Sequence, residues 1–336
     1  MRSQTYAGEM AAKTVIPNVA IGRDLVSMRD LSPSEVEALF HLTNLVKTRP
    51  DDFRTALAGK HVAMFFEKPS LRTRITFEAG VCGLGGTVSF VDQRQERLDA
   101  RESLADIAHN LERWVSAIVL RTFAHETIES MAEHCCVPVV NALSEVEHPC
   151  QALADYFTLQ EKFGNLRKVT LAYVGDGNNV LHSLLLTAAL FGSNIRIGTP
   201  KGYGPSSQIL ADARDIAKKT GATIELMTDP HKAVRGVDAI YTDAWTSMGH
   251  ERETEERARI FPPYQVNDEL MAEAAPHALF MHCLPAHRNE EVTDSVIDSV
   301  QSVVYDQAEN RMHVQKAILM MLVGGKNRLP LRSAHA

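Results

Sequence analysis

Long apolar runs are absent from this sequence, and cysteine is scarce. No stretch is long enough to span a bilayer, so the sequence predicts no membrane association. The five cysteines are Cys82, Cys135, Cys136, Cys150 and Cys283, an odd number without the spacing of a disulfide framework. We therefore expect a reducing compartment, the cytoplasm. The adjacent pair Cys135 and Cys136 does not suit a metal-binding clip.

An excess of positive charge is also lacking. Lys and Arg number 35 against 42 Asp and Glu, which gives a formal net charge of −7. This balance excludes a broad nucleic-acid-binding surface, so any anion must be bound by a few locally placed cations. The 336 residues, 45% of them hydrophobic, are enough for two globular domains.

The first 22 residues lack the apolar segment of a secretory signal. They contain Arg2, Lys13 and a single acid, Glu9, but no clear Arg-rich amphipathic pattern. We interpret residues 1–22 as an N-terminal extension, and an organelle transit peptide is the alternative.

Strands and helices alternate along the rest of the chain. Strands are predicted at His61–Phe66, Thr87–Val91, Ala117–Leu120, Pro138–Asn141, Lys168–Val174, Asn194–Gly198, Thr223–Met227, Ala239–Asp243 and Leu279–His282. Helices are predicted at Ser32–Thr48, Ser70–Leu84, Ser103–Val115, Thr127–His134, Val180–Phe191 and Asn310–Val323.

This alternation predicts an α/β protein with two doubly wound parallel-sheet domains and the active site in the cleft between them. We place the first domain at residues 23–155 and the second at 156–310, and assign residues 311–330 to a C-terminal helix.

The segment Ser70-Leu71-Arg72-Thr73-Arg74 follows a predicted strand and begins a helix. The backbone N–H groups of a helix start favour an anion, and hydroxyls with a guanidinium fork suit phosphate oxygens. The alternative is a helix cap followed by a solvated basic face.

A second motif is His148-Pro149-Cys150-Gln151. A helical turn after Pro149 would bring His148 and Gln151 to one side, where an imidazole and an amide suit the two polar ends of a carbamoyl group. The alternative is a helix start with a buried structural histidine.

The glycine-containing segment at residues 175–179 follows a strand and superficially resembles a dinucleotide-binding loop. Leu181 stands where the third glycine is required, and no ribose-binding acid follows the next strand. We therefore do not predict nicotinamide binding.

Two further motifs, Asp243-Ala244-Trp245-Thr246-Ser247-Met248-Gly249 and His282-Cys283-Leu284-Pro285, each follow a predicted strand. They are expected at the same edge of one sheet, where Asp243 would hold an ammonium group with Cys283 beside it. Alternatively, Cys283 is a small buried hydrophobic residue.

In their order and separation, these four motifs closely resemble those of the carbamoyltransferases, from about Arg23 to the last helix. The motifs at Ser70 and His148 resemble the superfamily shared with aspartate carbamoyltransferase, and those at Asp243 and His282 resemble its ornithine branch. The resemblance implies a transferase that moves the carbamoyl group of carbamoyl phosphate to the δ-amine of L-ornithine, giving citrulline and phosphate in arginine biosynthesis.

The resemblance also implies the site residues. It places carbamoyl phosphate on the first domain and on the last helix, which crosses back onto that domain, with the ligands Ser70, Leu71, Arg72, Thr73, Arg121, His148, Gln151, Cys283, Leu284 and Arg311. Of these, the implied catalytic residues are Arg72, Arg121, His148, Cys283 and Arg311.

Ornithine is placed on Leu143, Asn179, Asp243, Ser247 and Met248. The implied reaction needs no metal and no organic cofactor. Ornithine must lose a proton before it attacks, since its δ-amine has a pKa near ~10. A Cys283 thiolate balanced by Asp243 is one route for that proton. The Leu284–Pro285 peptide bond is expected to be cis, as in relatives.

Three positions depart from the family pattern. Leu71 replaces a threonine, Arg97 occupies a His or Gln position, and Asp99 replaces a glycine. In the family the residue at the Arg97 position reaches a neighbouring subunit's active site, which implies a homotrimer with shared sites. The alternatives are acetylornithine or putrescine as acceptor, or a catalytically silent regulatory subunit.

Overall fold

The computed structural model describes residues 24–94, 97–246 and 251–324. The predicted N-terminal extension lies outside these residues, and so do Ser247 and Met248.

The strands form two fully parallel sheets, as the sequence predicts. The first sheet has the order β2-β1-β3-β4 and the second the order β7-β6-β5-β8-β9. The strands of the first sheet are β1 (His61–Phe66), β2 (Thr87–Asp92), β3 (Ala117–Arg121) and β4 (Val139–Leu143). Those of the second are β5 (Thr170–Val174), β6 (Asn194–Gly198), β7 (Ile224–Met227), β8 (Ala239–Thr242) and β9 (Leu279–His282). Every predicted strand is present, within two residues at each end.

Helices cover both sheets, which explains why the central strands are apolar throughout rather than alternating. Every residue of β3 and β4 is buried, whereas the edge strand β2 is partly exposed. The helices are α1 (Pro33–Thr48), α2 (Leu71–Gly83), α3 (Leu104–Leu111), α4 (His125–His134), α5 (Pro149–Phe163), α6 (Asn179–Phe191), α7 (Ser207–Thr220), α8 (Pro230–Val234), α9 (Thr254–Ile260), α10 (Asp268–Ala272), α11 (Asp294–Ile297) and α12 (Val304–Val323).

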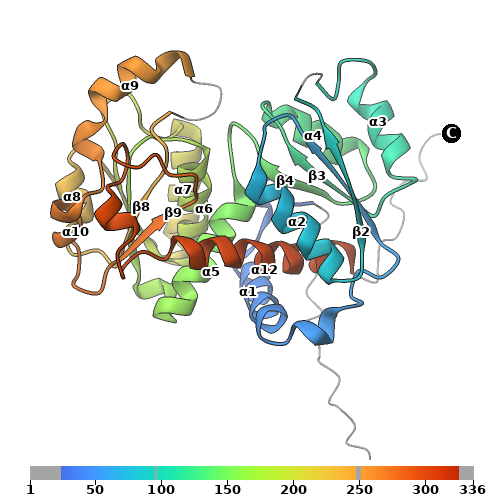
Figure 1. Cartoon of the computed structure of the whole chain (residues 1–336), viewed down its shortest axis with the longest axis horizontal. Coiled ribbons are helices and arrows are strands. Elements are labelled where there is room, and N and C mark those ends of the chain that lie inside the picture. Colours follow the sequence, from blue (N-terminus) through green and yellow to red (C-terminus); the bar gives the residue numbers. More distant parts are fainter. Residues whose placement is uncertain (1–23, 95–96, 247–250, 325–336) are drawn as a thin grey trace, which may run out of the picture.

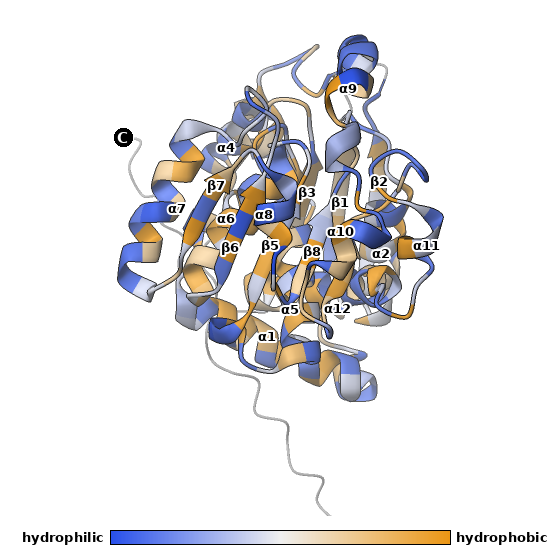
Figure 2. Ribbon diagram, turned by 90° about the vertical axis from the view of Figure 1, so that its left-hand side faces the viewer, coloured by the Kyte–Doolittle hydropathy of each residue, from blue (hydrophilic) through white to orange (hydrophobic). Residues whose placement is uncertain are grey.

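Each sheet and its helices form one lobe of the molecule (Figure 1). The helices α2, α3 and α4 lie with the first sheet, and α6 to α10 with the second. Figure 2 shows hydrophobic and hydrophilic bands alternating along α7. Its buried residues are Ile209, Ala213 and Ala217, at the spacing of a helix that covers a sheet with one face.

Two long helices join the lobes. Helix α12 starts beside β9 in the second lobe and runs across to α1 and α2 in the first, with α5 alongside it (Figure 1). One hydrophobic cluster runs through this junction and includes Val62 of β1, Phe157 of α5 and Ile195 of β6. No helix among the described residues is long and apolar enough to cross a membrane.

The predicted ends of two helices are wrong. Helix α12 begins at Val304 rather than Asn310, because its first turns are buried partly through polar side chains such as Gln307, which hydrophobic periodicity does not detect. Helix α3 ends at Leu111 rather than Val115, with tighter turns closing it and Trp114 exposed. Helix α12 therefore starts before the predicted boundary at residue 311, and the boundary predicted at 155 falls within α5.

Phe40 is central to the junction. Its ring centroid lies 5.4 Å from that of Phe157 and 4.9 Å from that of Phe191, so it connects α1, α5 and α6. We expect Phe40→Ala to lower the free energy of unfolding by about 3–5 kcal/mol, because it leaves a cavity in a packed core. Denaturant unfolding measures this loss. Trp114→Ala is the control, since Trp114 is 70% exposed, and an equal loss in both variants would contradict the prediction.

Candidate active site

A pocket of about 420 Å³ lies between the two lobes, where the carboxyl ends of strands from both sheets meet. Arg121 ends β3 and Leu143 ends β4, while Asp243 and Cys283 directly follow β8 and β9. In open parallel sheets this edge is the usual ligand site. Its lining includes thirteen of the predicted residues: Ser70, Leu71, Arg72, Thr73, Arg121, Leu143, His148, Gln151, Asn179, Asp243, Cys283, Leu284 and Arg311.

Three predicted site residues are not among the described residues that line the pocket. Arg97 is exposed and forms an ion pair with Asp99, at 3.0 Å between Nη2 and Oδ2. The other two, Ser247 and Met248, fall outside the described residues. The pocket also contains residues that the sequence did not predict, which are Lys68, Pro69, Val180, Ala244, Thr246, Pro285 and His287. Several of them are direct neighbours of predicted residues, which is the only sequence signal that marks them.

The start of α2 forms one wall of the pocket. Ser70 caps the helix, with its hydroxyl accepting from the Thr73 N–H at 3.2 Å. The remaining N–H groups of the first turn have no partner within the helix and suit an anion. Leu71 is 76% exposed, so its side chain does not close this wall.

Three arginines line the pocket, and no carboxylate within the described part of the chain forms an ion pair with Arg72, Arg121 or Arg311. Arg311 instead donates from Nη2 to the Thr73 hydroxyl at 2.7 Å. Burial and, to a smaller extent, the charge of the neighbouring Arg311 lower the pKa of Arg121 to about 9. The pocket thus concentrates positive charge that a bound anion would neutralise.

Four buried polar atoms of this wall have no hydrogen-bond partner in the described structure: Arg121 Nε, His148 Nδ1, Gln151 Oε1 and Arg311 Nε. Burial lowers the pKa of His148 well below its usual range, and both arginines add to the effect, so its ring is neutral at physiological pH. A ligand with both anionic and neutral polar atoms would satisfy this set of donors and acceptors.

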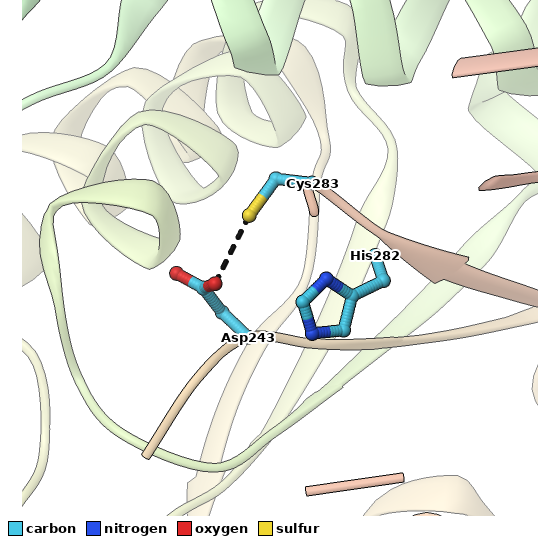
Figure 3. A group of neighbouring side chains, drawn as sticks. All are labelled: Asp243, His282 and Cys283. Carbon is cyan, nitrogen blue, oxygen red and sulfur yellow. Dashed lines mark hydrogen bonds between the residues drawn. The ribbon is translucent and has the colours of Figure 1, made fainter. Parts of the chain in front are cut away.

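Negatively charged and hydrogen-bond-accepting groups of the pocket come from the second sheet. Asp243 accepts from the Cys283 thiol at 3.0 Å and from the Asn178 amide at 2.7 Å. Figure 3 shows the thiol pointing at the carboxylate. Asn179, at the start of α6, donates to the Ser144 carbonyl at 2.5 Å. One acceptor-rich corner therefore faces the pocket beside the arginine-rich wall.

The described arrangement favours a neutral Cys283 thiol rather than the thiolate considered from the sequence. Burial raises the pKa of the thiol well above its usual range, and the Asp243 carboxylate raises it further. The thiol is therefore neutral and donates a hydrogen bond to the Asp243 carboxylate. This contact could not be predicted in detail from the sequence, since the two residues are forty positions apart.

Asp243, His282 and Cys283 lie close enough together to suggest a metal site. Both ring nitrogens of His282 are already engaged, because Nδ1 accepts from the Leu284 N–H at 2.8 Å and Nε2 lies 3.2 Å from Glu291. No dashed line joins the His282 ring to either neighbour in Figure 3. The ring thus holds the following segment, in which the Leu284–Pro285 bond is cis as expected.

The loop after β5 is packed against its own chain. The Gly177 N–H donates to the Tyr203 carbonyl at 2.8 Å, and a Cβ on Gly177 would lie 2.2 Å from the Gly204 carbonyl carbon. This close approach explains the glycine and agrees with the absence of a dinucleotide fingerprint.

A buried ion pair that the sequence did not reveal fixes the segment after Asp243. Arg257 lies 2.9 Å from Asp176 and donates to the Trp245 carbonyl at 2.6 Å. It also lies over the rings of Tyr203 and Phe261. Helix α9 is in this way tied to the strand end that carries Asp243.

Comparison with known proteins identifies the family. The model of the carbamoyl-phosphate-binding domain of aspartate/ornithine carbamoyltransferases matches residues 23–161, and that of the Asp/Orn-binding domain matches residues 167–322. The chain belongs to the aspartate/ornithine carbamoyltransferase family.

Within this family, the chain is 47% identical to the ornithine carbamoyltransferase of Pyrococcus abyssi over 306 residues, which are 90% of this chain and 96% of that protein. It is 46% identical to the anabolic ornithine carbamoyltransferase of Pyrococcus furiosus, over 90% of this chain and 97% of that protein. The solved ornithine carbamoyltransferase structure from P. furiosus superposes with a TM-score of 0.89 and covers 92% of this chain and 100% of that one.

The neutral state of Cys283 can be tested by alkylation. We expect iodoacetamide to modify the exposed Cys82 and Cys136 faster than Cys283 at pH 8, because thiolate is the reactive form. Peptide mass spectrometry over time gives the rates. Asp243→Asn removes the adjacent negative charge and should speed modification of Cys283. If Cys283 reacts as fast as Cys82 in the unaltered protein, its thiol is not held neutral.

Proposed function

We propose that this family member transfers the carbamoyl group of carbamoyl phosphate to the δ-amine of L-ornithine, giving L-citrulline and phosphate. The observation that carries the proposal is one pocket in which three arginines, without acidic partners among the described residues, lie beside the Asp243–Cys283 corner. A doubly charged phosphate fits the first group, and an amino acid with a second amine fits the corner.

In this proposal the phosphate lies at the start of α2, held by Ser70, Arg72, Thr73 and the backbone at Leu71. Arg121 and Arg311 span the phosphate and the carbonyl oxygen, to which His148 also donates. The carbamoyl NH₂ group donates to Gln151 Oε1 and to the Leu284 carbonyl. The unpartnered atoms of Arg121, His148, Gln151 and Arg311 support these assignments.

Ornithine occupies the second half of the pocket, which is lined by Leu143, Asn179 and Asp243. Ser247 and Met248, which lie outside the described residues, are proposed to bind it as well. The carboxylate of Asp243 attracts its ammonium group, and the neutral Cys283 thiol lies beside the reacting amine. Among the described residues that line the pocket, Asp243 is the only one with a carboxylate, so it is the acidic group that ornithine meets.

The amine attacks the carbonyl carbon in its neutral form, so turnover should rise with pH until bound ornithine is deprotonated. The carbonyl π electrons move to oxygen, where Arg121, Arg311 and His148 stabilise the oxyanion. The C–O bond to phosphate then breaks, with its electron pair leaving on phosphate. The attacking nitrogen loses a proton to the departing phosphate. No metal or organic cofactor enters this sequence of steps.

The direct test is formation of the carbamoylated product by purified protein from carbamoyl phosphate with ornithine, acetylornithine or putrescine, which would give citrulline, acetylcitrulline or carbamoylputrescine. We expect turnover with ornithine alone, because Asp243 suits a free α-amino acid. Turnover with another acceptor only would replace the proposed substrate, and no turnover with any would favour a silent regulatory subunit. The anabolic name of the P. furiosus relative supports a place in arginine biosynthesis, and we propose a cytoplasmic location.

Arg72→Lys should lower kcat/KM about a hundredfold, roughly 3 kcal/mol, with an unchanged unfolding midpoint. Lysine keeps the charge but loses the planar fork that binds two phosphate oxygens. Steady-state kinetics with ornithine saturating measures the effect. Arg74→Lys is the matched control, because Arg74 lies on the same helix and pairs with Glu78 at 2.9 Å instead of lining the pocket. Equal kinetics for both variants would contradict the role of Arg72.

We also propose that the active unit is a homotrimer in which Arg97 serves the phosphate of a neighbouring subunit. Arg97 is exposed and does not line the pocket of its own chain, which supports a role in trans, and the exposed pair with Asp99 is easily exchanged for a phosphate. In a cyclic trimer each chain gives one such loop and receives one.

Complementation tests this arrangement. Arg72→Ala and Arg97→Ala should each have little activity alone. Trimers refolded from a mixture should regain some, because a site in an Arg97→Ala chain with an Arg72→Ala neighbour contains both arginines. Verified mixed trimers that stay as inactive as the parents would contradict action in trans, and so would full activity of Arg97→Ala alone.

A further inference from the structure

A buried chain of hydrogen bonds lies directly behind Gln151. Asp155, one turn further along α5, is fully buried and accepts from Gln151 Nε2 at 2.8 Å and Gln307 Nε2 at 2.9 Å, both at Oδ1. Its other oxygen, Oδ2, accepts from the Tyr241 hydroxyl at 2.9 Å. These contacts join α5, α12 and β8, and Asp155, Gln307 and Tyr241 do not line the pocket.

The direction of the hydrogen bonds in this network is determined at Gln307, which is joined to Gln151 through Asp155. The backbone N–H of His282 can only donate, and it donates to Gln307 Oε1 at 3.0 Å. The amide of Gln307 must therefore present its NH₂ group to Asp155, whose Oδ1 must accept. Because the same oxygen faces Gln151, that side chain must also present its NH₂ group to Asp155.

Gln151 is left with one orientation. An unconstrained amide can present either its oxygen or its NH₂ group to a ligand, since the two ends have the same shape. Here the NH₂ group is held by Asp155, so Oε1 is the atom left for the pocket, and it has no partner in the described structure. The pocket therefore has an acceptor at this point and no donor.

We propose that Asp155 is a positioning residue that gives the enzyme its preference for a carbamoyl over an acetyl group. It does so by fixing the Gln151 amide with its oxygen toward the NH₂ group of the donor substrate. This inference rests on the proposed function and extends it to the choice of donor. An acetyl group has a methyl in place of NH₂ and would leave Gln151 Oε1 without a hydrogen bond.

The charge of Asp155 agrees with this role. Burial raises its pKa to about 6, against the three hydrogen bonds and the nearby Arg311, which lower it. At pH 8 the carboxyl group is therefore an anion that accepts only. With Oδ1 only able to accept, the NH₂ groups of both Gln307 and Gln151 must face it, and the His282 N–H imposes the same orientation on Gln307 from the other side.

The test compares two stable ligands in binding assays without ornithine. Phosphonoacetamide carries the NH₂ group, and acetonylphosphonate carries a methyl group in its place. We expect the unaltered protein to bind the amide more tightly. In Asp155→Leu the amide should lose about tenfold in affinity while the ketone changes little, so the ratio of the two Kd values falls. A general distortion of the pocket would weaken both ligands and leave the ratio unchanged.

Asp155→Asn is the matched control. Its side-chain oxygen can still accept from both glutamines, with its NH₂ group turned to Tyr241, so the ratio should stay near that of the unaltered protein. Gln151→Leu supplies a second variant that leaves Asp155 held by Tyr241 and Gln307. It should lose the preference by itself, and Asp155→Asn should have no further effect in that background.

The proposal is overturned if folded Asp155→Leu keeps the original ratio, if Asp155→Asn loses it to the same extent, or if Gln151→Leu retains it. Should Asp155→Leu fail to fold, the Gln151→Leu result decides. Citrulline formation by the unaltered protein is measured in parallel. Its absence would count against the proposed function, whereas an active protein with an unchanged ratio counts against Asp155 alone.

Discussion

The burial of Arg121 and Arg311 in one pocket, without a carboxylate partner in the described chain, is the constraint on which the site depends. Removing an ion from water costs several kcal/mol even in real proteins, and two like charges add to that cost. The lowered pKa of Arg121 has this origin. The arrangement persists because β3 and α12, which carry the two side chains, are held by apolar packing on the rest of their surfaces. The two buried charges therefore lower the stability of the fold and favour the binding of an anion.

The helices that join the lobes determine where this charge lies. Helix α12 brings Arg311 from the second lobe to Thr73 of the first, and α5 brings His148 and Gln151 to the same point. Asp155 balances part of the positive charge from behind, since its anion raises the pKa of Arg311 while burial lowers it. The part of the pocket that is proposed to bind carbamoyl phosphate is therefore complete only when both lobes and the helices α5 and α12 are in place. This gives a physical reason for a site between domains rather than within one.

Much of the architecture could be predicted from local patterns. A buried parallel strand is a short apolar run, so His61–Phe66 and Leu279–His282 were found with their correct ends. Ser32 was marked as a helix start by Pro33 after it, and it forms a capping box with Glu35. What failed required contacts between distant residues. The early start of α12 depends on Gln307, whose partner Asp155 is 152 positions away, and the same distance concealed their role behind Gln151.

The site shows the same division. Motifs at strand ends, together with the family resemblance, predicted most of the residues that line the pocket, because the edge of a parallel sheet gathers them whatever their chemistry. Protonation was not predictable, since it depends on which groups meet: Cys283 is neutral only because it is buried against Asp243. The Arg257–Asp176 pair was missed for a related reason, as Arg257 belongs to no motif and lies far from Asp176 in the sequence.

The departures from the family pattern act at points where the fold tolerates them. At Leu71 the side chain is mostly exposed, and the phosphate-binding groups of a helix start are backbone N–H groups that any residue supplies. At Asp99 the replacement of glycine gives Arg97 an exposed partner within its own chain. A solvated ion pair such as Arg97–Asp99 is weak. A phosphate competes strongly with Asp99 for the Arg97 guanidinium only if the other arginines of the pocket do not already neutralise its charge. With Arg72, Arg121 and Arg311 already in place, the proposed contribution of Arg97 from a neighbouring subunit would be the one most sensitive to the balance between Asp99 and a bound phosphate.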